Sequence, residues 1–285
     1  MSNIRIIPRL DIKGPNVVKG IHLEGLRVIG RPNEMARHYY NDGADELFFM
    51  DVVASLYERN SLSDVISKTA KEIFIPLTVG GGLRTVKDMS QVLHAGADKV
   101  CFNTAAIKNP ELISQAANSF GSSTIVIAIE AIKQSHGNYL AYTDNAREFT
   151  GVEVFEWAER VEALGAGEIV ITSVDHEGTG DGYDIELVKR IANKAKIPVI
   201  AHGGAGKIQD VINVLTQANA SAVAISSLMH YDYIKQNQTG AVNELEGNVE
   251  FIKQKRNFHK FVTTSIQELK NEMTKSKIPI SQHIS

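Results

Sequence analysis

The chain has 285 residues, of which 43% are hydrophobic and 22% charged, and its formal net charge is −3. This balance is typical of a globular protein with a sizeable core, and the lack of a basic block argues against nucleic-acid binding. We expect no membrane span and no signal peptide, because no apolar run is long enough for either. The single cysteine, Cys101, excludes an internal disulfide and favours a reducing, cytoplasmic location.

Eight short apolar runs predict buried parallel strands, because they are continuously apolar rather than alternating. They span residues 4–10, 46–52, 74–79, 98–102, 124–130, 168–174, 197–201 and 222–226. Amphipathic segments of helical length lie between them, at residues 32–42, 62–72, 86–95, 110–120, 152–164, 185–195 and 208–217. Strands and helices that alternate in this way predict a single (β/α)8 TIM barrel, with the active site at the C-terminal ends of the strands.

The sequence repeats itself at an offset of 122 residues. Residues 43–47 recur as residues 165–169, and an Ile-Pro pair followed by Gly-Gly recurs at the same offset. Two unrelated segments at one offset predict two homologous half-barrels, about residues 1–121 and 122–285, within one domain. Each half has a Gly-Gly pair at a strand end, which suggests a substrate with a phosphate at each tip.

The connection after the eighth strand is unusually long. We expect the last helix at residues 266–277, where Ser265 and Glu268 form a capping box. Residues 231–264 then form an insertion between the eighth strand and the eighth helix, on the catalytic face. Its apolar residues indicate that it is partly ordered.

Glycines at the third and seventh predicted strand ends can bring backbone amides close to an anion. These glycines and the polar residues of the next strand are Gly81, Gly82, Asn103 and Thr104 in the first half and Gly203, Gly204, Ser226 and Ser227 in the second. A tight turn would explain one Gly-Gly pair, but two pairs beside polar donors favour two phosphate sites. Further substrate contacts are predicted for Lys19, Asp51, Thr172 and Ser173.

Two carboxylates, Asp11 and Glu130, end the first and fifth predicted strands, on opposite sides of the barrel mouth. Such a pair can divide acid and base work if the two environments separate their pKa values. Alternatively, each pairs with a nearby lysine, such as Lys19 or Lys133. No His/Cys cluster has metal-ligand spacing, so we predict neither a metal nor a cofactor.

Four charged residues lie at the strand starts, the opposite end of the barrel: Arg5, Glu46, Lys99 and Glu168. They are able to pair as a closed ring of ion pairs. Such a ring is either a stabilising plug or a gate across the barrel axis.

Several motifs carry a resemblance to a known family: Ile6-Ile7-Pro8 with Leu10-Asp11, residues 43–47, residues 76–82, residues 96–100, Asn103-Thr104, Gly178-Thr179 and residues 203–207. Through them the chain resembles the cyclase subunits of imidazole glycerol phosphate synthase from histidine biosynthesis, over residues 4–230 and 265–277. The resemblance implies that a partner glutaminase releases ammonia at the strand-start face and that the ammonia crosses the barrel through the charged gate. It then closes the imidazole ring of a bisphosphorylated aminoimidazole carboxamide ribonucleotide. Asp11 matches the general acid of the family, Glu130 its second catalytic aspartate and Asp98 a residue at the glutaminase interface.

The chain departs from this family pattern on the acceptor side only. Position 130 is Glu instead of Asp, Arg9 replaces a small Cys beside Asp11, and His202 replaces a Ser. The insertion after the eighth strand is a fourth departure. These changes leave two alternatives open: a paralogue that delivers ammonia to another acceptor, such as a sugar in surface-polysaccharide amidination, or a non-catalytic scaffold that activates a glutaminase.

Overall fold

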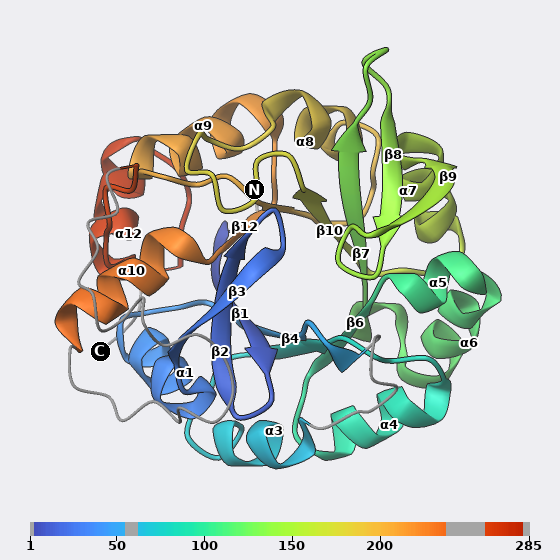
Figure 1. Ribbon diagram of the computed structural model, residues 1–285, viewed down its shortest axis with the longest axis horizontal. Coiled ribbons are helices and arrows are strands. Elements are labelled where there is room, and N and C mark those ends of the chain that lie inside the picture. Colours follow the sequence, from blue (N-terminus) through green and yellow to red (C-terminus); the bar gives the residue numbers. More distant parts are fainter. Residues whose placement is uncertain (1–2, 55–61, 238–259, 282–285) are drawn as a thin grey trace.

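The computed structural model describes residues 3–54, 62–237 and 260–281. Parallel strands close into a barrel with helices around it, which confirms the predicted (β/α)8 fold (Figure 1). In order around the barrel the strands are β1 (Arg5–Lys13), β4 (Leu47–Asp51), β5 (Leu77–Gly80), β6 (Lys99–Phe102), β7 (Ile125–Lys133), β10 (Glu168–Ser173), β11 (Val199–His202) and β12 (Ala222–Ile225). Pairing of β12 with β1 completes the ring.

The helices that cover the barrel begin and end within three residues of the predicted positions. They are α1 (Pro32–Asn41), α3 (Ser63–Thr69), α4 (Val86–His94), α6 (Glu111–Phe120), α7 (Val154–Ala163), α8 (Ile185–Ala192), α9 (Ile208–Ala218) and α12 (Ile266–Lys275). Local capping fixes several starts. Ser265 caps α12 by accepting from the backbone N–H of Glu268, but the Glu268 carboxylate accepts from Thr264 instead of completing the predicted capping box.

Several elements were not expected from the sequence. Two are β-hairpins, formed by β2 (Asn16–Ile21) with β3 (Glu24–Gly30) and by β8 (Tyr139–Thr143) with β9 (Glu148–Glu153). Two are helices that directly follow barrel strands, α5 (Thr104–Lys108) and α10 (Ser227–Gln236), and one is the 3-10 turn η1 (Ser122–Thr124). The third predicted strand was placed too early, because β5 begins only after Pro76. Residues 231–236 of the predicted insertion are helical, and its residues 238–259 lie outside the described part of the chain.

The internal repeat extends from sequence motifs to whole elements. Strand β11 begins at Val199, 122 residues after β5 begins at Leu77. Helix α9 begins at Ile208, and it follows the start of α4, Val86, by the same 122 residues. Each of the two hairpins follows the first strand of its half, β1 or β7. The two halves therefore place equivalent strand ends around one mouth.

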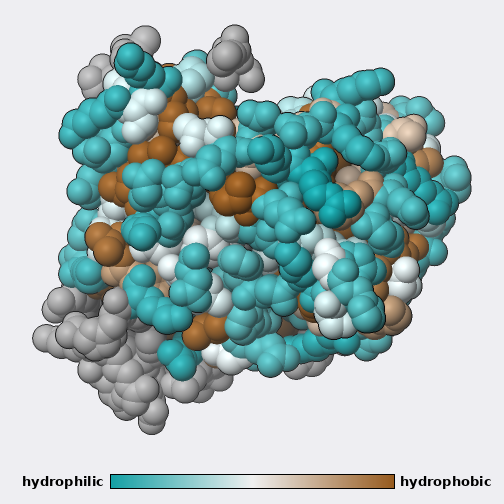
Figure 2. All heavy atoms as spheres, turned by 90° about the horizontal axis from the view of Figure 1, so that it is seen from above, coloured by the Kyte–Doolittle hydropathy of each residue, from teal (hydrophilic) through white to brown (hydrophobic). Residues whose placement is uncertain are grey.

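The barrel strands are buried on both faces, which explains their continuously apolar sequences. Neighbours on β1 show this division: Ile6 packs against the helices, whereas Ile7 belongs to a cluster inside the barrel. The inner cluster includes Phe48, Cys101, Val126, Val170, Ile200 and Ala224. Cys101 is a buried core side chain, and its burial raises the pKa of the thiol to about 12. From the side, the outer surface is mainly hydrophilic, with small hydrophobic patches (Figure 2).

Candidate active site

A cavity of about 590 Å³ opens at the C-terminal ends of β4, β5, β6 and β7. Asp51, Gly81, Gly82, Asn103, Thr104 and Glu130 are among its lining residues. Gly81 has a φ of 96°, and a Cβ there would lie 2.1 Å from the carbonyl oxygen of Asp51. Only glycine fits this position, so the strand end exposes backbone where a side chain would otherwise stand.

The polar side chains of this first site also anchor the neighbouring hairpin. Asn103 Nδ2 donates to the carbonyl of Tyr142 at 3.0 Å, whereas its buried Oδ1 has no hydrogen-bond partner among the described residues. Thr104 Oγ1 lies 3.4 Å from Asp144 Oδ1, at the tip of the hairpin. Asn103 and Thr104 line the cavity, but part of their hydrogen-bonding capacity is already used.

A second, much smaller pocket of about 10 Å³ lies at the ends of β11 and β12. Its lining includes Glu177, His202, Gly203, Gly204, Ser226 and Ser227. Gly204 has a φ of 115°, and a Cβ would lie 2.0 Å from the carbonyl oxygen of Gly182. Helix α10 begins here at Ser227, so its free N–H groups and partial positive charge add to an anion site.

The strand β1 carries four inward-facing residues from one end of the barrel to the other. A period of two along a strand puts Arg5, Ile7, Arg9 and Asp11 on the same face. Arg5 lies at the strand-start end, Ile7 in the inner apolar cluster and Asp11 at the mouth. Arg9 therefore lies between the apolar interior and Asp11.

The two candidate catalytic carboxylates have different environments. Asp11 forms an ion pair with Arg9, whose Nε lies 2.9 Å from Oδ1. Glu130, on β7 across the barrel, accepts a hydrogen bond from the backbone N–H of Ala146 at 2.8 Å. Burial raises the pKa of Glu130 to about 7, against the opposing effects of this hydrogen bond and of Arg9. Glu130 can thus hold or release a proton near neutral pH.

The alternative pairing of these carboxylates with lysines is wrong. Lys19 forms a buried ion pair with Glu177, and Lys133 pairs with Glu186 at 2.9 Å. Glu177 was missed at the sequence level, although it directly precedes the Gly178-Thr179 motif. It also accepts from the backbone N–H of Leu23, so it fastens the β2–β3 hairpin to the mouth.

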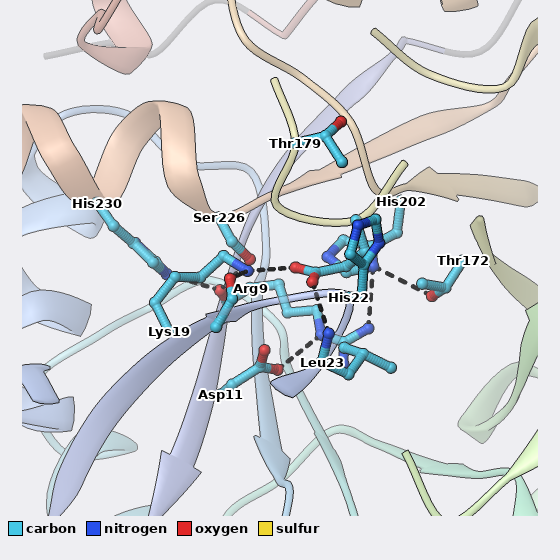
Figure 3. A network of polar contacts seen from close by, with 12 residues as sticks. Arg9, Asp11, Lys19, His22, Leu23, Thr172, Thr179, His202, Ser226 and His230 are labelled. Atoms are coloured by element: carbon cyan, nitrogen blue, oxygen red, sulfur yellow. Dashed lines mark hydrogen bonds and ion pairs between the residues drawn. The ribbon is translucent and has the colours of Figure 1, made fainter. Parts of the chain in front are cut away.

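Arg9 is the centre of a buried polar network at the mouth (Figure 3). Its Nη1 lies 3.2 Å from Nδ1 of His202, which in turn lies 3.1 Å from the hydroxyl of Thr172. Its carbonyl oxygen accepts from Ser226 Oγ at 2.9 Å and from His230 Nε2 at 3.0 Å. The hydroxyl proton of Ser226 is therefore committed to the backbone of Arg9.

Both histidines of this network are neutral at physiological pH. Burial, and then the positive charge of Lys19, lower the pKa of His230 to about 3. Burial and the charges of Arg9 and Lys19 lower the pKa of His202 well below its ordinary range. The hydroxyl of Tyr39, a residue that the sequence analysis missed, forms a hydrogen bond of 2.7 Å with Nδ1 of His230.

The remaining predicted substrate residues are spread around the mouth. Lys19 also donates to the carbonyl of Gly20, so its ammonium is held in place. Asp51 accepts from the backbone N–H of Val53 at 3.1 Å and lines the larger cavity. The hydroxyl of Ser173 is buried and has no hydrogen-bond partner among the described residues.

At the strand starts, the four charged residues form a closed ring. Arg5 Nη1 lies 2.6 Å from Glu46 Oε2 and 3.1 Å from Glu168 Oε1. Lys99 Nζ lies 3.0 Å from Glu46 Oε2 and 3.1 Å from Glu168 Oε1. Cations and anions thus alternate across the barrel axis, and the inner apolar cluster separates this ring from the mouth. Near the ring, the exposed Asp98 accepts from the backbone N–H of Leu77 at 2.8 Å.

Within the described ranges, no group of three or more His, Cys, Asp or Glu side chains is arranged to hold a metal ion. The same part of the chain contains no helix with the length and apolar character needed to cross a membrane.

A family model described as "Histidine biosynthesis protein" matches residues 5–235, which include every strand of the barrel. The chain is also similar to proteins named imidazole glycerol phosphate synthase subunit HisF. The protein from Legionella pneumophila is 58% identical over 210 residues, which are 74% of this chain and 99% of that protein. The protein from Alkaliphilus metalliredigens is 49% identical over 234 residues, or 82% and 93% of the two chains. The protein from Natranaerobius thermophilus is 47% identical over 230 residues, or 81% and 91%.

Proposed function

Because the chain belongs to the histidine biosynthesis protein family, we propose that it is the cyclase subunit of imidazole glycerol phosphate synthase. In this reaction, ammonia condenses with the ketone of a bisphosphorylated aminoimidazole carboxamide ribonucleotide, and the products are imidazole glycerol phosphate, an aminoimidazole carboxamide ribotide and water. One observation carries the proposal: two pockets with glycine-lined strand ends flank a pair of carboxylates at one mouth. This arrangement suits a long substrate with a phosphate at each end.

Asp11 and Glu130 divide the proton transfers of ring closure and cleavage. They lie on opposite strands of the barrel, so each reaches the substrate from its own side. Glu130, with its pKa near 7, exchanges a proton readily at neutral pH. Arg9 keeps the Asp11 carboxylate oriented through its ion pair.

Ammonia reaches this mouth through the barrel. The inner apolar cluster accepts neutral ammonia but imposes a large desolvation cost on ammonium. The ring of Arg5, Glu46, Lys99 and Glu168 is the gate at the entrance.

The source of the ammonia is a glutaminase subunit that docks on the strand-start face and forms a heterodimer with this chain. Phe74, three residues before the start of β5, is 83% exposed, and its ring and that of Tyr40 meet edge to face, with 6.3 Å between the ring centroids. Exposed aromatic side chains of this kind are frequent anchors of protein interfaces. Phe74 and Asp98 both lie at strand starts, on the same side as the gate.

Turnover of the bisphosphorylated carboxamide ribonucleotide by the purified chain tests this function. Ammonium salt replaces the glutaminase, so only the cyclase is assayed. We expect ammonia-dependent formation of the imidazole product. A folded chain that binds phosphate but gives no product would contradict the cyclase assignment.

The position of Arg9 favours one alternative, an enzyme of the same ammonia-transfer type with a different acceptor. Its guanidinium fills the space beside Asp11 and bridges to His202 across the mouth. If the cyclase assay fails, phosphorylated and nucleotide-linked sugars are the next acceptors to assay with ammonium salt. The intact anion sites argue against a purely scaffolding role.

A further inference from the structure

The guanidinium of Arg9 is buried, with 4% of the residue exposed, and it connects two parts of the mouth. Nε donates to Asp11, and Nη1 contacts Nδ1 of His202 (Figure 3). Its Cζ lies 5.8 Å from the ring centroid of Phe48, at the top of the inner apolar cluster. A buried cation is stable only when its donors are used, so these contacts fix the side chain in one place.

The contact with Arg9 determines the tautomer of His202. Nδ1 of His202 has two neighbours: the Arg9 guanidinium, which has only hydrogen-bond donors, and the Thr172 hydroxyl, which can donate as well as accept. A proton on Nδ1 would face the guanidinium, so Nδ1 is the acceptor. The neutral imidazole therefore carries its proton on Nε2. Nε2 has no hydrogen-bond partner within the described part of the chain, yet the residue lines the pocket at the ends of β11 and β12.

Other side chains at this pocket are already engaged. Ser226 donates its hydroxyl proton to the carbonyl of Arg9, and the carboxylate of Glu177 holds the ammonium of Lys19. The donors that line the pocket are thus backbone N–H groups, the hydroxyl of Ser227 and the Nε2–H of His202. An acceptor-only group, such as a phosphoryl oxygen, complements this set of donors.

We propose that His202 is a specificity-determining residue whose Nε2–H binds a phosphate monoester in the second pocket, and that Arg9 is the positioning residue that fixes this tautomer. The inference rests on the proposed function, because the ligand is one of the two phosphates of the substrate. The guanidinium of Arg9 also orients Asp11. The catalytic carboxylate and the phosphate-binding imidazole are therefore both positioned by Arg9.

Long-range ¹H–¹⁵N correlation spectra of the full chain labelled with ¹⁵N-histidine test the proposal. The signal of His202 is assigned by its loss in His202→Ser. We expect a neutral ring at pH 7 with Nε2 protonated and Nδ1 unprotonated, and a shift of the Nε2 signal on titration with inorganic phosphate. A ring protonated on Nδ1 would overturn the proposal.

Matched variants separate the donor from its support. His202→Gln keeps an N–H donor near the Nε2 position and should retain phosphate affinity, whereas His202→Ala, which has no side-chain donor, should weaken it about tenfold, the loss expected for one hydrogen bond to a charged acceptor. Arg9→Met should move part of the proton of His202 to Nδ1, and Arg9→Lys, which keeps the charge, should do so less. Circular dichroism checks that each variant is folded, and an unchanged tautomer in folded Arg9→Met would contradict the positioning role.

The same titration separates this inference from the proposed function. If phosphate shifts the backbone amides of Gly203 and Gly204 but not Nε2 of His202, the anion site exists and only the role of His202 is wrong. If phosphate shifts neither, the second phosphate site is absent, and the proposed function fails with it. Thr104→Val, in the first site, is the control that should leave the His202 signal unchanged.

Discussion

Buried charged residues at the two ends of the barrel have different partners. At the strand starts, Arg5, Lys99, Glu46 and Glu168 neutralise one another in a closed ring. At the mouth, Glu130 has no cation within ion-pair distance among the described residues, and burial holds its pKa near 7. The first arrangement keeps every charge fixed, whereas the second leaves a proton free to move.

This contrast indicates a division of labour along one axis. β1 contributes a residue to each level: Arg5 to the ring, Ile7 to the apolar interior and Asp11 to the mouth. Changes at the mouth should therefore impair turnover with any source of ammonia. Changes at the strand starts should impair only turnover that depends on glutamine.

Asp11→Asn is the strongest test of the mouth. The amide keeps the shape of the side chain but removes the proton transfer, so turnover should fall by about 10³-fold, within the range for a lost acid–base group. The loss should be the same with ammonium salt and with glutamine plus the glutaminase. Unchanged turnover would remove Asp11 from the mechanism.

Gly81→Ala and Gly204→Ala form a matched pair for the two anion sites. Each new Cβ would lie about 2 Å from a carbonyl oxygen, so the backbone at that strand end must move. We expect each variant to weaken substrate binding by about 10- to 100-fold, as expected for a misplacement of about 1 Å. Calorimetric titration with the substrate in the absence of ammonia measures this effect. If only one variant weakens binding, one of the two sites holds no phosphate.

Phe74→Ala tests the strand-start face. Loss of an exposed aromatic anchor should weaken the complex with the cognate glutaminase by about 2 kcal/mol, or about 30-fold in Kd. Surface plasmon resonance measures the affinity. Phe149, which is 62% exposed on the β8–β9 hairpin at the mouth, supplies the control, because Phe149→Ala should leave the affinity unchanged.

Lys99→Met opens the ring of ion pairs without touching the mouth. Turnover with ammonium salt should stay within twofold of the original. Turnover with glutamine should change by several-fold, since coupling between two sites of this kind has a free energy of about 1–3 kcal/mol. Equal changes with both nitrogen sources would show that the ring is only a stabilising plug.

Glu130→Gln should remove the part of the pH dependence of the free energy of unfolding that comes from the buried Glu130 carboxyl. Because the pKa of Glu130 is raised from 4.5 to about 7, the folded state binds its proton more tightly than the unfolded state. The resulting stability is present below pH 4.5 and is lost as the pH rises to 7. Urea unfolding at pH 5 and pH 8 should therefore show a decrease of about 2–3 kcal/mol that Glu130→Gln lacks. A decrease of the same size in the variant would assign it to other groups.

Much of this fold could be predicted because apolar runs and amphipathic segments follow simple periods. The exceptions have local causes. Residues 227–236 did not read as a helix because buried residues follow one another along α10 instead of lying on one face. The strands of the β8–β9 hairpin contain few fully buried positions, so they lack the apolar run that marks the barrel strands.

Only the site residues that lie on the barrel strands or at their ends could be predicted from the sequence. Arg9 beside Asp11 follows from the period of two along β1, and their ion pair bears this out. The pairing of Lys19 with Glu177, 158 residues apart, and the reach of Arg9 to His202 depend on how the closed barrel brings distant loops together. No local pattern encodes such contacts.

The most direct test of the division between the two ends is the origin of the nitrogen in the product. The chain and its glutaminase are supplied with [amide-¹⁵N]glutamine in a buffer that contains an excess of unlabelled ammonium, and the imidazole product is analysed by mass spectrometry. Transfer through the barrel predicts a product that carries ¹⁵N with little dilution. A product whose label is diluted to the level of the bulk ammonium would contradict a channel from the charged ring to the mouth.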